Sequence, residues 1–233
     1  MGTLTSLATT SSASVPDATA WEEAYNRFET SGQEIRKFTR RLRSMGAMSW
    51  DRNQAVVELF CGRGNGLVAL CRLGFPQVEG VDLSPSLLSQ YNGPARCHVA
   101  DCRSLPFEDE SKDVIIIQGG LHHLQTLPED LDRCLSEMHR VLKANGMVLI
   151  VEPWLTPFLS FVHWVCRRKM ARRLCSKIDS LATMIEHEHE AYHQWLRQPG
   201  FVLNTLDRYF LPERSACRWG KLMFAGRKRS GIV

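Results

Sequence analysis

The stretch Val56–Gly66, with the sequence VVELFCGRGNG, most constrains what this chain can fold into. An apolar run reaches Glu58 and gives way to glycines on alternate positions, and a second apolar run, Val78–Asp82, ends in an acid. A buried strand that turns on glycine into a helix, beside a second strand that ends in a carboxylate, is typical of the adenosine-cofactor site of an open α/β sheet. The 233 residues suffice for one large domain with additions.

Strand-like and helical patterns alternate along the middle of the chain, which predicts parallel strands with right-handed crossovers. We expect a helix that runs to about Lys143 and ends at Gly146, followed by helical character and two more strand-like runs, Phe201–Phe210 and Lys221–Lys228, that pair antiparallel. The earlier strands are expected over Ala55–Phe60, Val78–Asp82, Ala95–Ala100, Asp113–Gln118 and Met147–Glu152.

The chain is expected to have three parts. Residues 1–20, rich in Ser, Thr and Ala, predict a disordered tail, and residues 21–52 predict N-terminal helices with a break near Ser31-Gly32. Residues 53–233 form the main domain, in which 153–200 is a helical insert. The first twenty residues lack the basic start and apolar core of a secretory signal, and no apolar run reaches the ~20 residues of a membrane span. The cysteines form no CxxC pair. We therefore expect a cytoplasmic protein with reduced thiols.

The glycine spacing indicates which cofactor binds. A dinucleotide site has G-x-G-x-x-G, whereas this chain has Gly62-x-Gly64-x-Gly66, with Glu58 before the turn. An acid at that point suits a ligand with a cationic centre better than one with phosphates. S-adenosylmethionine, a sulfonium with an ammonium group and no phosphate, is such a ligand.

Two further acids follow the next strands. Asp82 ends the second strand, where a carboxylate can accept both ribose hydroxyls of the cofactor. Asp101 follows the third strand and can accept the exocyclic amine of adenine, with the Cys102 backbone beside it. The alternative for each acid is a structural role, as a solvated strand end, a turn or a helix cap.

As an ordered set, these motifs resemble the class I S-adenosylmethionine-dependent methyltransferases, in particular the small-molecule group that includes the ubiquinone/menaquinone-type enzymes. The resemblance implies a Rossmann-like seven-stranded sheet, mostly parallel with an antiparallel last strand and helices on both faces, and identifies 53–233 as the methyltransferase domain. It departs at Phe60, where many relatives carry glycine. The matching segments are ELFCGRGNG (Glu58–Gly66), VEGVDLS (Val78–Ser84), ADCRSLPFEDESKDVII (Ala100–Ile116), GGLHHL (Gly119–Leu124) and EMHRVLKANGMVLIVEP (Glu137–Pro153).

The resemblance also implies which residues hold the cofactor. It assigns Gly62 and Gly64 to the methionine part, Asp82 to the ribose and Asp101 to the adenine. The full set of expected cofactor-binding residues is Glu58, Gly62, Gly64, Gly66, Asp82, Leu83, Asp101, Cys102 and Gln118.

The methyl acceptor is expected at the end of the fourth strand, in Gln118–Leu124. This segment reads QGGLHHL and lacks the Asn/Asp-Pro-Pro-aromatic motif of enzymes that methylate exocyclic base amines. Its absence argues against the adenine and cytosine amines of DNA or RNA as acceptors, and no DNA partner is expected. His122 and His123 are the nearest bases, and a histidine's unperturbed pKa of about 6.5 suits proton removal near neutral pH. We expect His122 to line the site; the alternative is that one or both histidines orient the loop.

Two features of the insert remain open. One apolar stripe at helical spacing contains Trp154, Phe158, Phe161 and Val165, and six basic residues follow it within 167–177. This pattern suits peripheral contact of 154–177 with a membrane or binding of a lipid-like substrate. The alternative is a helix that simply packs on the domain. The segment His189–His193, HEAYH, matches the zinc motif H-E-x-x-H, but its His/Glu-rich context favours a chance match, and no metal is expected.

The sequence therefore predicts a methyltransferase that uses S-adenosylmethionine to methylate a small or lipid-like molecule at oxygen or carbon. Two alternatives remain: a non-catalytic cofactor-binding partner of another methyltransferase, and an RNA methyltransferase that uses the basic insert. The oligomeric state is not predicted.

Overall fold

The computed structural model describes residues 18–231 of the chain. The predicted disordered tail lies outside the described residues, except that residues 18–20, which we had included in it, belong to helix α1 (Ala18–Phe28). A second helix, α2 (Ser31–Ser44), follows. The break falls one residue earlier than predicted, because the Thr30 hydroxyl caps α2 by accepting from the Gln33 N–H.

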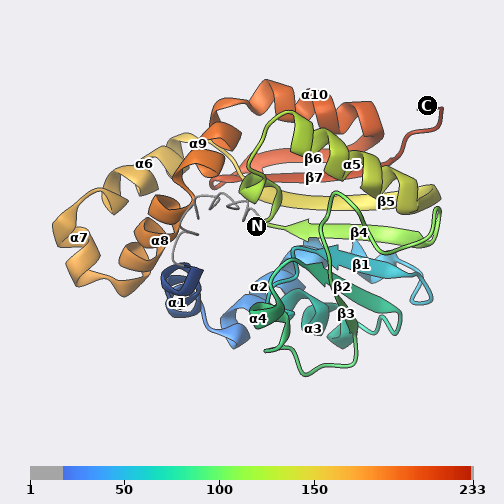
Figure 1. Cartoon of the computed structure of the whole chain (residues 1–233), viewed down its shortest axis with the longest axis horizontal. Coiled ribbons are helices and arrows are strands. Elements are labelled where there is room, and N and C mark those ends of the chain that lie inside the picture. Colours follow the sequence, from blue (N-terminus) through green and yellow to red (C-terminus); the bar gives the residue numbers. More distant parts are fainter. Residues whose placement is uncertain (1–17, 232–233) are drawn as a thin grey trace, which may run out of the picture.

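Seven strands form one sheet in the order β3-β2-β1-β4-β5-β7-β6 (Figure 1). Neighbouring strands from β3 to β5 are parallel, and β7 is antiparallel to both β5 and β6. This topology confirms the predicted Rossmann-like sheet. The strands are β1 (Val56–Leu59), β2 (Val78–Asp82), β3 (Arg96–Val99), β4 (Lys112–Gln118), β5 (Leu142–Pro153), β6 (Phe210–Arg218) and β7 (Lys221–Lys228).

Helices cover both faces of the sheet, as predicted. On one face, α5 and α10 pack against alternate residues of the central strands, such as Ile115 and Ile117; on the other, α2 and α3 pack against Val114 and Ile116. This period of two explains why the central strands are apolar without interruption. The remaining helices are α3 (Asn65–Arg72), α4 (Pro85–Leu88), α5 (Glu129–Val141), α6 (Pro157–Cys166), α7 (Lys169–Leu174), α8 (Ser176–His187), α9 (His189–Arg197) and α10 (Pro199–Tyr209), with short 3₁₀ turns η1 (Ala47–Ser49) and η2 (Leu121–His123).

The predicted strand Phe201–Phe210 is wrong, because most of this segment is helix α10. Val202, Thr205, Leu206 and Tyr209 are buried at the i, i+3, i+4, i+7 spacing of a helix, and that periodicity was missed in an apolar run. The strand that pairs with β7 is the polar β6, whose residues are mostly exposed. An exposed edge strand carries too few apolar residues to be recognised by hydropathy.

Strand β5 begins five residues earlier than predicted. Helix α5 ends at Val141, and Leu142 is already paired with Lys112 of β4. Gly146 therefore lies inside β5 and does not end a helix. Lys143, which we expected at the end of the helix, belongs to β5, and its ammonium donates to Asp113 Oδ2 at 2.8 Å.

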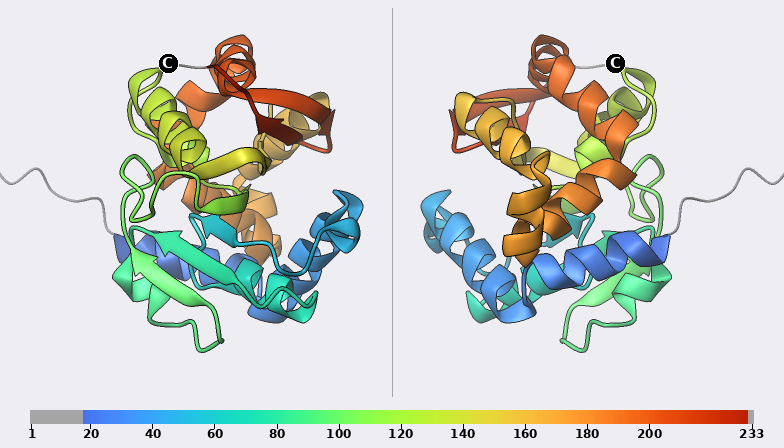
Figure 2. Two further views of the ribbon diagram at one scale, coloured as in Figure 1. Left: turned by 90° about the vertical axis from the view of Figure 1, so that its right-hand side faces the viewer. Right: turned by 90° about the vertical axis from the view of Figure 1, so that its left-hand side faces the viewer.

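The insert after β5 is helical, from α6 to α9, and lies beyond the carboxyl end of β4, where the arrow of β4 points (Figure 1). Helix α1 packs alongside α8, so the N-terminal segment and the insert meet over this end of the sheet (Figure 2). Trp154, predicted on the exposed stripe of the insert, instead precedes α6 and is buried against Trp195. No helix among residues 18–231 has the length and apolarity needed to cross a bilayer.

Candidate active site

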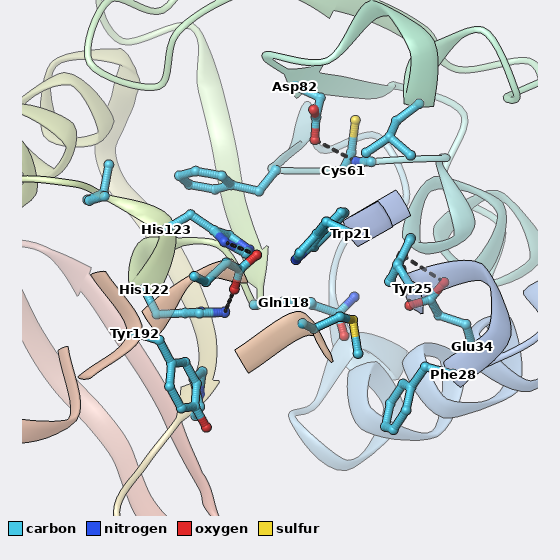
Figure 3. A pocket seen from close by; sticks show the side chains of 18 of the residues that line it. Trp21, Tyr25, Phe28, Glu34, Cys61, Asp82, Gln118, His122, His123 and Tyr192 are labelled. Atoms are coloured by element: carbon cyan, nitrogen blue, oxygen red, sulfur yellow. Dashed lines mark hydrogen bonds and ion pairs between the residues drawn. The ribbon is translucent and has the colours of Figure 1, made fainter. Parts of the chain in front are cut away.

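A cavity of about 850 Å³ lies at the carboxyl ends of β1, β2 and β4. Strand order reverses between β1 and β4, and this is the crevice where open α/β sheets bind ligands. Helix α1 and the insert helices α6, α8 and α9 enclose the cavity (Figure 3). Its lining includes seven of the nine residues predicted to bind the cofactor and both histidines: Glu58, Gly62, Asp82, Leu83, Asp101, Cys102, Gln118, His122 and His123.

The turn after β1 has a tightly constrained backbone. Gly62 and Gly64 have positive φ values of 52° and 74°, and Gly64 is the N-cap of α3. Phe60 has a φ of 56°, which strains a residue with a side chain. Its ring lies against Gly120, where an added Cβ would overlap the ring. Phe60, which stands where many relatives carry glycine, therefore fits because Gly120 has no side chain.

Asp82 is fixed by the main chain on both sides. Its Oδ2 accepts from the Gly62 N–H at 2.7 Å, and its Oδ1 accepts from the Ser84 N–H at 2.9 Å (Figure 3). Leu83, between the two, is 69% exposed and lines the cavity. The carboxylate is therefore held at the cavity edge with lone pairs left over, an arrangement that suits bonds from a pair of vicinal hydroxyls.

Glu58 is buried and only half satisfied. Its Oε1 accepts from the Gln118 side-chain amide at 3.1 Å, and its Oε2 has no partner among the described residues. Burial raises the pKa of Glu58 to about 8, and the Gln118 hydrogen bond only partly opposes this shift. A cationic group bound beside Glu58 would compensate the buried carboxylate, so the residue fits the ammonium end of S-adenosylmethionine.

Gly64 and Gly66, also predicted to bind the cofactor, are not among the residues that line the cavity. A Cβ at Gly66 would overlap both carboxylate oxygens of Glu58, and a Cβ at Gly64 would overlap the ring of Tyr91. The structure thus gives both glycines a packing role: Gly66 leaves room for the Glu58 carboxylate, and Gly64 for Tyr91. Their predicted contact with the cofactor is not tested.

Asp101 is already paired with a cation. The Arg103 guanidinium donates to both Asp101 oxygens and also to Asp130 at 2.6 Å. These hydrogen bonds hold the pKa of Asp101 below its usual range, although its partial burial opposes the shift. Since the carboxylate remains partly exposed at the cavity, it keeps acceptor capacity for an amine, but Arg103 fixes its orientation.

The N-terminal helices are bound to the glycine turn through Glu34. This buried carboxylate of α2 accepts from the Tyr25 hydroxyl at 3.0 Å, from Arg63 at 3.0 Å and from the Asn65 side chain at 2.7 Å. Arg63, in the turn itself, also donates to Asn26 of α1 at 2.6 Å. The sequence analysis missed this network, because Glu34 lies in a polar amphipathic helix and nothing there distinguishes it from exposed acids.

His122 is oriented by Glu152, the last acid of β5. His122 Nδ1 lies 2.7 Å from Glu152 Oε2, while Glu152 Oε1 accepts from the N–H groups of Gly120 and Leu121. Burial and the adjacent His123 lower the pKa of His122, and Glu152 opposes this. Although Glu152 is fully buried, His122 and the two N–H donors hold its pKa below the usual range. Glu152 lies near the end of a buried strand, as Glu58 and Asp82 do. The sequence analysis did not use this position to identify Glu152.

His123 faces a different acid, Glu188, which precedes α9. His123 Nδ1 lies 3.0 Å from Glu188 Oε1, and this carboxylate raises the pKa of His123 against the opposing effect of burial. His122, His123 and Glu188 form the one cluster of three potential metal ligands found between residues 18 and 231. In the HEAYH segment, the rings of His189 and His193 lie 4.4 Å apart between centroids. Among residues 18–231, no group of three potential metal ligands includes this pair.

The comparisons with known proteins agree with this geometry. Residues 57–150 match the protein family described as a methyltransferase domain. The demethylmenaquinone methyltransferase of Chlorobaculum parvum is 25% identical over 166 residues, which cover 65% of this chain and 67% of that protein.

Solved structures share the fold at lower identity. The PH0226 protein of Pyrococcus horikoshii aligns with a TM-score of 0.64 at 18% identity, over 90% of this chain and 98% of that one. Geranyl diphosphate C-methyltransferase from Streptomyces coelicolor, in complex with Mg²⁺, geranyl diphosphate and S-adenosyl-L-homocysteine, aligns with a TM-score of 0.59 at 15% identity, over 82% and 77% of the two chains. At these identities the likeness shows the fold alone.

The chain spans about half the length of most curated relatives that it matches. The matched segments cover 47%, 40% and 52% of three further relatives.

Proposed function

We propose that this chain, which carries a class I S-adenosylmethionine-dependent methyltransferase domain, transfers a methyl group to a small or lipid-like acceptor at an oxygen or carbon atom. The observation that carries the proposal is His122, which lines the cavity with Gln118 (Figure 3) and is oriented by the buried Glu152. It stands next to the cofactor-binding residues, in the arrangement expected of an oriented general base.

The cofactor side of the cavity supplies binding. Glu58 holds the ammonium group of the methionine part, the Gly62 turn approaches its backbone, Asp82 accepts from the ribose and Asp101 from the adenine amine. When bound, S-adenosylmethionine supplies an electrophilic methyl group on a sulfonium. The protein's task is then to hold the acceptor in line and, where the acceptor starts protonated, to remove its proton.

His122 is suited to that proton transfer. If Nδ1–H donates to Glu152, the other ring nitrogen, Nε2, carries a lone pair and accepts protons. The lowered pKa of His122 keeps the ring neutral near pH 7, and Glu152 stabilises the imidazolium that forms when it takes a proton. Because Glu152 also holds the Gly120 and Leu121 N–H groups, it fixes the loop together with the base.

The acceptor class follows from the enclosure of the cavity and from the relatives. Apolar side chains of α6 and α8, among them Leu159, Val162 and Ile185, also line the cavity. The similar proteins include a demethylmenaquinone methyltransferase and a geranyl diphosphate C-methyltransferase. We therefore propose a small acceptor with a hydrocarbon part.

The test is transfer by the purified chain from methyl-labelled cofactor to a panel of hydroxylated quinones, phenols and isoprenoids, followed by product mass. His122→Asn should lower kcat by roughly 10²–10⁴ and leave the affinity for S-adenosylhomocysteine unchanged. His187→Asn, at an exposed position of α8, is the matched control. Cofactor binding with no transfer unless a second protein is added would favour the non-catalytic partner, and RNA binding with a steep salt dependence would favour the RNA methyltransferase.

A membrane surface is the partner that we propose for the insert. Most large apolar side chains that are exposed in the described part of the chain gather there: Leu155, Phe158, Phe161, Trp164, Met170, Leu174 and Trp219. Among the basic residues beside them, Arg172 is bound by Asp179 and Glu186, while no described carboxylate pairs with Arg167, Arg168, Lys169, Arg173 or Lys177. Exposed aromatics next to unpaired cations suit the interface of an anionic bilayer.

Vesicle flotation tests this contact. The chain should float with phosphatidylcholine vesicles that contain phosphatidylglycerol and float less with phosphatidylcholine alone. Phe161→Ser should reduce flotation, whereas Leu211→Ser, at an exposed apolar position of β6, should not. Equal loss in both variants, or no flotation by the unaltered chain, would contradict the proposal.

A further inference from the structure

Two cations that line the cavity have no carboxylate partner among the described residues. Arg41 comes from α2 and Lys221 is the first residue of β7, next to Pro153 at the end of β5. Both line the cavity. Within residues 18–231, neither forms an ion pair, and the one polar side-chain contact of Arg41 is with the Gln118 oxygen at 3.3 Å.

The acids near these cations are engaged elsewhere. Glu152 holds His122 and two main-chain N–H groups, and Glu34 holds Arg63, Tyr25 and Asn65. Glu29 is paired with Lys37, and Glu58 accepts from Gln118. The charges of Arg41 and Lys221 are therefore available to a ligand.

Their environment makes these unpaired charges unfavourable without a ligand. Burial and, to a smaller extent, the positive charge of Arg41 lower the pKa of Lys221 to about 8, although Glu152 opposes the shift. Burial also lowers the pKa of Arg41. Two cations that repel each other in a partly dry cavity are stabilised by an anion between them.

The cavity also has an apolar side. Its walls come from the insert helices and from the residues just before β7: Phe158, Leu159, Val162, Leu181, Met184, Ile185 and Trp219. A hydrocarbon chain or ring along this wall would have its polar end near Arg41 and Lys221. A ligand that satisfies both features is an anionic amphiphile.

We propose that Arg41 and Lys221 bind an anionic oxygen group of the methyl acceptor, a carboxylate or a phosphate, whose hydrocarbon part lies along α6 and α8. The inference rests on the proposed function, since it names the class of acceptor for that same cavity. The two residues are specificity determinants: they place the acceptor beside Gln118 and His122 and take no part in proton transfer.

Calorimetric binding of three probes of equal chain length tests the subsite: octanoate, octyl phosphate and octan-1-ol, each with saturating S-adenosylhomocysteine. The anionic probes should bind at least about tenfold more tightly than the alcohol. Arg41→Gln and Lys221→Met should each remove most of this preference. Arg96→Gln and Lys143→Met, at exposed positions of β3 and β5, are the matched controls and should keep it. The stronger of octanoate and octyl phosphate identifies the anion.

Binding of S-adenosylhomocysteine to the same samples separates two kinds of failure. If the unaltered chain does not bind it, the proposed function fails. If the unaltered chain and both variants bind it equally, the variants are folded, and equal affinity for octanoate, octyl phosphate and octan-1-ol then overturns the anion subsite alone.

A pH series gives a second readout for Lys221. The charged groups that face it are Arg41 and Lys37 from α2, Glu29 before α2 and Glu152 from β5. Affinity for octanoate should fall from pH 7 to pH 9.5 as Lys221, with its pKa of about 8, loses its proton. Lys221→Arg stays charged and should bind octanoate with little pH dependence. A flat profile for the unaltered chain would show that Lys221 does not contact the anion.

Discussion

The two parts of the cavity differ in how their charges are satisfied before any ligand binds. On the cofactor side, Asp82 accepts two main-chain N–H groups and Asp101 is paired with Arg103, so one acid, Glu58, keeps an unpartnered oxygen. On the acceptor side, Arg41 and Lys221 face no free acid. Each part thus keeps an incompletely paired group whose ionised form is opposite in charge to the group that we propose it binds. The comparison shows how one cavity can separate a cationic donor from an anionic acceptor.

The largest effect is expected at Glu152, which is fully buried and orients His122. Glu152→Leu leaves His122 and two main-chain N–H groups without an acceptor in a fully buried position. We expect a loss of about 3–5 kcal/mol in the free energy of unfolding, measured by urea denaturation. Glu213→Leu removes an exposed ion pair with Arg227 and should cost less than about 1 kcal/mol. Similar losses in the two variants would show that Glu152 does not organise the cavity.

Asp82→Ala tests whether the cofactor side is specific for the ribose. The variant should weaken binding of S-adenosylhomocysteine by roughly 1.5–3 kcal/mol in calorimetry, since a charged hydrogen-bond acceptor is lost. The octanoate affinity on the acceptor side should be nearly unchanged. An unchanged affinity for S-adenosylhomocysteine would mean that the ribose is held elsewhere.

Gly66→Ala tests the packing beneath Glu58. The added methyl group would overlap the Glu58 carboxylate, so stability should fall by about 1–3 kcal/mol and cofactor affinity should fall with it. Gly200→Ala is the control, because a Cβ at this position of α10 meets nothing and should leave stability equal or slightly higher. Equal thermal unfolding of both variants would contradict the role given to Gly66.

The smallest effect is a proton release. In the unligated chain the Glu58 carboxyl, with its pKa of about 8, holds its proton at pH 7, and a bound ammonium group would favour the ionised form. Binding of S-adenosylhomocysteine at pH 7 should therefore release up to one proton, measured by calorimetry in buffers of different ionisation enthalpy. Glu58→Gln should abolish the release. A release that persists in this variant would place the titrating group elsewhere.

Sequence patterns predicted the cofactor side better than the acceptor side, for physical reasons. Glu58, Gly62 and Asp82 lie within one strand–turn–strand segment, where local chain geometry fixes which groups meet. Arg41 and Lys221 meet through tertiary packing alone, and each is unremarkable within its own element. The same difference appears in the fold: the buried parallel strands were recognised, whereas the polar edge strand β6 was not.

Helix α1 contacts both parts of the cavity. Its Asn26 accepts from Arg63 in the glycine turn, its Arg27 lies 3.9 Å from Asp179 of α8, and its Trp21 packs edge-on to His123. A cofactor that holds α1 against the glycine turn therefore also completes the side of the cavity that contacts the acceptor. Turnover should consequently follow a compulsory order, donor before acceptor, with S-adenosylhomocysteine leaving last and competing with the donor in steady-state inhibition.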